Sequence, residues 1–213
     1  MKRTALAILA TLLTMASTSF AATSATNATT VAPTLQVQVN VQKAVSLTLA
    51  TGATGGISHC TVTAAGGNPD YTMNFGTVDA LGINAGNCNK FNPATPGTSD
   101  AVYWSDYQIL PVYTSHKTFA GTTVTAQVTT DFGAPHNIFI VRDSANSATV
   151  PASAAAMTAM GTGSADTIGA AGVVSGTALT RYIGVEVTPA NNAVTAPLTG
   201  AQTATVTFTL TVQ

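Results

Sequence analysis

The chain has 213 residues, and 7% of them are charged, against about 25% in an average soluble domain. Seven basic and eight acidic residues give a formal net charge of −1, which excludes the basic surface that nucleic-acid binding requires. Threonine and alanine together supply about a third of the residues. This small, β-branched and weakly charged composition indicates an extracellular β protein.

A secretory signal peptide is predicted over residues 1–21. The basic pair Lys2-Arg3 precedes an uncharged run over residues 4–16, and residues 19–21 (SFA) place small side chains before a cleavage site. The apolar run is shorter than the roughly 20 residues that span a bilayer. We therefore expect export and cleavage before Ala22, with no membrane span in the mature protein.

The clearest predicted strand covers residues 34–42, TLQVQVNVQ, and follows a small, polar and flexible extension over residues 22–33. Its apolar residues alternate strictly with Gln and Asn. One face of the strand is therefore apolar, and it is formed by Leu35, Val37, Val39 and Val41. We expect residues 34–213 to form a single β domain that begins with this strand.

Nine further strands are predicted from apolar or β-branched runs separated by Gly, Asn, Pro and Ser clusters. They cover residues 45–49, 60–63, 71–78, 101–104, 107–113, 122–130, 138–141, 181–188 and 203–212. The last of them alternates apolar residues with threonine, which specifies its register firmly. About ten short strands in this pattern are typical of an antiparallel, immunoglobulin-like β-sandwich. One short helix is predicted over residues 151–160, PASAAAMTAM, within a long loop that continues to residue 176.

The cysteines favour a disulfide over a metal site. Cys60 and Cys88 are the only two, and an even pair in an exported chain most simply forms one bond. A metal site would add His59, but neighbouring residues of a strand point to opposite faces, and no CxxC spacing is present. We expect no metal and no cofactor.

No residue pattern indicates catalysis. The histidines are far apart in the sequence and belong to no nucleophile motif: His59, His116 and His136. Glu186, the only glutamate, leaves a glycosidase open, although a solvent-facing residue or a partner of Arg181 or Arg142 is the simpler interpretation. Four aspartates beside strands or turns leave a calcium site open without the usual spacing: Asp100, Asp106, Asp131 and Asp143. We expect a protein that is not an enzyme.

Two binding modes can be read from the sequence. Exposed rings of Trp104 and Tyr107 would form a platform for a carbohydrate, whereas buried rings would fill the core. A flexible leader followed by an amphipathic strand suits strand donation, in which main-chain hydrogen bonds and alternate side-chain pockets bind the strand. Pairing of residues 34–42 within their own domain also stays open.

Several segments resemble the spore coat protein U family and the related archaic chaperone-usher pilins. These are the amphipathic strand over residues 34–42, Cys60-Thr61-Val62, residues 74–78 (NFGTV) and the C-terminal Thr/Val strand. The resemblance implies an incomplete immunoglobulin-like sandwich that the N-terminal strand of the neighbouring subunit completes. It also implies a periplasmic chaperone and an outer-membrane usher as partners, with Cys60 as one half of the family's disulfide.

These observations predict a secreted, pilin-like subunit of a fimbria or other cell-surface filament. We expect it to polymerise with itself by donor-strand exchange, through Leu35, Val37, Val39 and Val41, and to serve in adhesion or biofilm formation. The alternative is a monomeric, secreted carbohydrate-binding β-sandwich that uses Trp104 and Tyr107.

Overall fold

The computed structural model describes residues 36, 45–114, 121–133, 136–170, 172–189 and 200–212. The chain divides into two units, Met1–Gln42 and Lys43–Gln213. The signal peptide, the extension and the side chains of Leu35, Val37, Val39 and Val41 lie outside the described residues. No helix within the described ranges is long and apolar enough to cross a bilayer.

The second unit is built almost entirely from strands, eleven of them within the described ranges. They are β1 (Val45–Thr51), β2 (Val62–Ala64), β3 (Tyr71–Met73), β4 (Asn89–Phe91), β5 (Ala101–Tyr113), β6 (Thr123–Thr130), β7 (Ile138–Asp143), β8 (Met157–Ala159), β9 (Asp166–Gly169), β10 (Leu179–Val187) and β11 (Thr205–Thr211).

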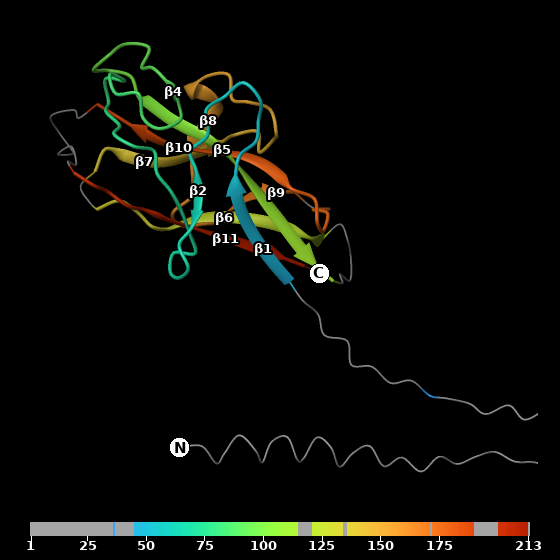
Figure 1. The fold of residues 1–213 in the computed structure, drawn as a ribbon. Coiled ribbons are helices and arrows are strands. Elements are labelled where there is room, and N and C mark those ends of the chain that lie inside the picture. Colours follow the sequence, from blue (N-terminus) through green and yellow to red (C-terminus); the bar gives the residue numbers. More distant parts are fainter. Residues whose placement is uncertain are drawn as a thin grey trace, which may run out of the picture. The chain divides into compact units, whose positions relative to one another are not determined.

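The strands form two main antiparallel sheets and a small hairpin. The larger sheet has the order β1-β5-β10-β7-β8, with β4 also paired to β5, and the smaller sheet has the order β11-β6-β9. Strands β2 and β3 pair with each other. Figure 1 shows β10 beside β5 and β11 beside β6. Because Tyr107 and Ile109 of β5 pack with Val124 and Ala126 of β6, the two sheets enclose a common core and confirm the predicted β-sandwich.

Strand β5 is the centre of the larger sheet and runs for 13 residues. The sequence predicts a break at Ser105-Asp106, and this prediction is wrong. Both side chains are fully buried, and both have hydrogen-bond partners. The Ser105 hydroxyl accepts the Cys60 N–H at 2.9 Å, and the Asp106 carboxylate is bonded to Thr54 and His59. Hydrogen-bonded polar side chains can be buried at little cost, so the strand continues through them.

The helix predicted over residues 151–160 is not present. The alanines form a single 3-10 turn at Ala154–Ala156, and the chain then enters β8, which pairs with β7. Pairing buries Met157, and Met160 at the end of the run is also buried. Tertiary pairing therefore overrides the helix propensity of the alanines. Strand β9 likewise lies inside the predicted loop, and pairs with β6.

The disulfide between Cys60 and Cys88 is present, with the two Cα atoms 5.2 Å apart, as predicted. It links the segment before β2 to the segment before β4. Cys60 is buried, and the bond closes a sequence separation of 28 residues. In the chain-entropy description, such a link stabilises the fold by roughly 3 to 4 kcal/mol.

The buried carboxylate of Asp106 anchors the loop between β1 and β2. It accepts the backbone N–H of Thr54 at 2.9 Å and lies 2.6 Å from Nδ1 of His59. Gly52 allows this approach, because a Cβ there would lie 2.0 Å from the Asp106 carboxyl carbon. Burial alone would raise the pKa of Asp106, but the bonds from Thr54 and His59 outweigh it and hold the pKa below its usual value.

Candidate strand-binding groove

Strand β11 forms an edge of the smaller sheet. It pairs with β6 from Thr205 to Thr211, and within the described part of the chain it has a strand neighbour on that side only. Among the described residues, no strand pairs with the backbone N–H and C=O groups along the other side. Such an edge is a template for pairing with another chain.

The two faces of β11 differ as its sequence predicts. Val206, Phe208 and Leu210 are only half-buried and pack against the core, whereas Thr207 and Thr209 are exposed. On the threonine face, the hydroxyl of Thr207 lies 2.9 Å from that of Thr129. The apolar face is thus turned inward without being fully covered.

A groove of about 330 Å³ lies along this uncovered side of the core. Residues from both sheets and from the β2–β3 hairpin line it, among them Leu47, Leu49, Met73, Ile183, Val206 and Phe208. The ring of Tyr107 also lines the groove and meets that of Phe208 edge-on, with the centroids 5.7 Å apart. The groove is thus rich in apolar side chains, and Asp70 is the one acidic residue among those that line it.

The core is incompletely covered along this groove. The buried cluster of Tyr107, Ile109 and Val124 is flanked by half-buried apolar residues, including Leu47 and Leu49 of β1 and Val206 and Phe208 of β11. Burial of apolar surface stabilises the fold by roughly 25 cal/mol per Å², and the exposed part of each such side chain does not contribute to this stabilisation. An apolar groove beside an open strand edge is suited to an extended peptide with apolar residues at every second position.

The aromatic residues of the predicted carbohydrate platform are buried. Trp104 is 4% exposed and Tyr107 is 2% exposed, and they belong to separate clusters on opposite faces of β5. Trp104 packs on Phe91 and Tyr182, while Tyr107 lies at the groove. The two rings therefore do not form an exposed platform.

The acidic residues are distributed among several roles. Arg142 pairs with Asp166 at 2.9 Å rather than with Glu186, and Asp131 lies 3.5 Å from Nε2 of His136. Asp143 is buried and accepts the N–H of Ser147. His116 lies outside the described residues. Within the described part of the chain, no three His, Cys, Asp or Glu side chains gather at a point that could hold a metal ion.

Two features of the surface are not predicted by the sequence. The β2–β3 hairpin contributes one end of the groove, and nothing in its short strands indicates this. Glu186 lies with Asp100 in a second pocket, although the two are 86 positions apart in the chain. The alternation of apolar residues and threonine in β11 is the one part of the groove that the sequence indicates.

No protein-family model, curated protein or solved structure matches this chain.

Proposed function

We propose that the protein is a secreted subunit of an extracellular or cell-surface filament, in which residues 34–42 of one copy occupy the groove of the next copy. The donated strand pairs with the open edge of β11 and covers the core. The observation that carries this proposal is the apolar groove beside that edge, in a chain whose β1 is directly preceded by an amphipathic segment.

The segment and the groove have the same period. Leu35, Val37, Val39 and Val41 recur at every second position, as do Val206, Phe208 and Leu210 on the apolar face of β11. A strand placed along the edge would direct all four apolar side chains inward and leave Gln36, Gln38 and Asn40 in solvent. Burial of the four side chains contributes roughly 6 to 12 kcal/mol, before the cost of ordering both chains is subtracted.

The connection to β1 favours donation to another copy. Only Lys43 and Ala44 separate residues 34–42 from the start of β1 at Val45. A hairpin with two connecting residues needs positive φ angles, for which Asn and Gly are preferred. Lys43 and Ala44 do not favour these angles, so the sequence does not favour a two-residue hairpin between residues 34–42 and β1.

The export features and the family resemblance support the same function. The predicted signal peptide and the Cys60–Cys88 bond suit an oxidising compartment outside the cytosol. The resemblance to archaic chaperone-usher pilins adds a periplasmic chaperone and an outer-membrane usher as assembly partners, and adhesion or biofilm formation as the role of the filament. Chemistry is not part of this function, and we propose no enzymatic activity.

Removal of the donor segment tests the proposal. We expect a chain of residues 22–213 to give filaments in electron microscopy and a ladder of SDS-resistant oligomers on a gel. A chain of residues 43–213 should give neither, because its groove has no strand to receive. Filaments formed by the shorter chain, or a folded monomer from both chains, would contradict strand donation.

A further inference from the structure

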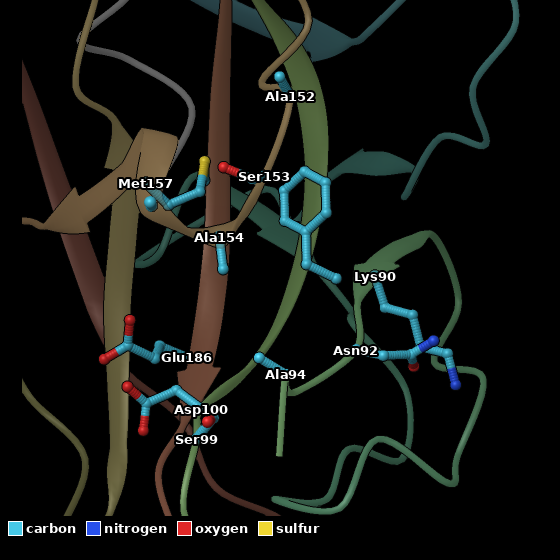
Figure 2. A pocket seen from close by; sticks show the side chains of 12 residues that line it. Lys90, Asn92, Ala94, Ser99, Asp100, Ala152, Ser153, Ala154, Met157 and Glu186 are labelled. Atoms are coloured by element: carbon cyan, nitrogen blue, oxygen red, sulfur yellow. The ribbon is translucent and has the colours of Figure 1, made fainter. Parts of the chain in front are cut away.

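A second pocket, of about 680 Å³, lies at one end of the larger sheet and is shown in Figure 2. Its residues come from β4 and the segment that follows it, from the turn before β8 and the start of β8, and from β10. Glu186 is on the face of β10 opposite to Ile183, which lines the groove. The pocket is therefore separate from the strand-binding groove, and its volume is in the range of small-molecule sites.

One end of the pocket carries two carboxylates. Figure 2 shows Glu186 and Asp100 side by side there. No hydrogen bond or ion pair with another described residue reaches either carboxylate, although both side chains are partly buried. Burial raises the pKa of Glu186, and the negative charge of Asp100 raises it further. Two acidic side chains that line the pocket thus have no hydrogen-bond donor among the described residues.

Lys90 lines the same pocket but is already bonded elsewhere. Its ammonium group donates to the carbonyl oxygens of Gly82 at 2.5 Å and Asn84 at 3.0 Å. The loop that carries these carbonyls is held by Asp79, whose carboxylate accepts the N–H of Asn84 at 2.7 Å. Figure 2 shows Lys90 at the far end from the carboxylates. The lysine therefore does not compensate them.

The rest of the pocket combines an aromatic ring with small polar groups. The ring of Phe91 stacks on Trp104, with the centroids 5.2 Å apart and 21° between the planes. This stacking fixes the orientation of a half-buried ring at the pocket. Asn92 and Ser153 add an amide and a hydroxyl, each able to donate and to accept.

We propose that this pocket binds a sugar residue of a glycan, through hydrogen bonds from its hydroxyls to Glu186 and Asp100 and through contact of its apolar face with Phe91. A sugar ring presents hydroxyls along its edge and C–H groups on its faces, and the pocket presents acceptors beside an aromatic ring. A metal ion fits less well, because among the described residues no third His, Cys, Asp or Glu side chain joins the two carboxylates. The site would give each subunit its own adhesive function, and it does not depend on strand donation.

The test uses an array of immobilised glycans, followed by titration of the retained sugar. The single tryptophan, Trp104, provides a fluorescence signal because it stacks on Phe91. We expect saturable binding that Glu186→Gln and Asp100→Asn each weaken about tenfold, because a hydrogen bond to a charged acceptor is about twice as strong as a neutral one. The matched acid-to-amide variant Asp131→Asn, at an exposed position that lines neither the pocket nor the groove, should bind as the unchanged protein does.

Stability separates loss of binding from loss of the fold. Glu186→Gln removes a partly buried charge beside Asp100, so we expect its thermal midpoint to equal or exceed that of the unchanged protein. Weaker sugar binding with an undiminished midpoint supports the site. No retention of any glycan by the array, or equal binding by all three variants, would overturn it.

Discussion

Replacing Val39 with aspartate is expected to abolish filament formation, whereas replacing Gln38 with aspartate should leave filaments intact. In the proposed complex, Val39 points into the apolar groove, whose lining includes Leu49 and Phe208, and Gln38 faces solvent. An unpaired carboxylate in such a groove costs several kcal/mol, or else takes up a proton at a comparable cost. The gross stabilisation from the donated strand is of similar size, so one inward charge is sufficient to prevent assembly.

The two variants are matched in charge, position and size of the change. Both positions precede β1 in the sequence, so we expect the fold of β1–β11 to be unaffected, and circular dichroism checks this. The readout is the SDS-resistant ladder and the number of filaments in electron microscopy. Equal polymerisation of both variants would show that the alternation of residues 34–42 plays no part in assembly, and loss only with Gln38→Asp would place the opposite face in the groove.

Replacing Asp106 with asparagine is expected to lower the free energy of unfolding at pH 7 by roughly 1 to 3 kcal/mol, the cost of leaving a buried polar group without one of its hydrogen-bond partners. The Asp106 side chain is fully buried and holds both the Thr54 N–H and His59, so the loop before Cys60 depends on it. Asparagine keeps the shape but loses the charge and one acceptor. Urea unfolding followed by fluorescence of Trp104 measures the difference.

The contribution of Asp106 to the stability of the fold should decrease as the pH falls. Because the hydrogen bonds hold its folded-state pKa below the usual value, the ionised form contributes stability above the unfolded-state pKa of about 4. That contribution is lost as the pH falls through the folded-state pKa. The difference in the free energy of unfolding between the unchanged protein and Asp106→Asn should therefore be largest at pH 7 and should decrease in acid. Asp70→Asn, at an exposed position, serves as the control, and a difference that does not change with pH would contradict this assignment.

Local patterns in the sequence determine how well each element can be predicted. The alternation in β11 and the pairing of the only two cysteines are set by near neighbours and by composition, and both predictions are confirmed. The break predicted in β5 fails because Ser105 and Asp106 find partners far along the chain. The predicted helix at residues 151–160 fails because β7 offers an edge to the same residues.

The candidate sites follow the same rule. The contribution of β11 to the groove can be predicted from the alternation in its sequence. The contribution of the β2–β3 hairpin depends on tertiary packing. The second pocket gathers Phe91, Asp100, Ser153 and Glu186 from three separate segments, and no spacing in the sequence connects them. Trp104 attracts attention as a lone tryptophan, yet it lies beneath Phe91, which is the ring that lines the pocket.

The most direct test of strand donation is to titrate a synthetic peptide of residues 34–42 into the full chain carrying Val39→Asp. This variant keeps an intact groove but has no competent donor, so it should remain monomeric and bind one peptide per chain. Binding is measured by calorimetry and by the rise in thermal midpoint that ligand binding to the folded state produces. We expect the peptide with the natural sequence to bind and a peptide with Val39→Asp to fail. No binding of the natural peptide to the folded variant would contradict the proposal that the groove receives this strand.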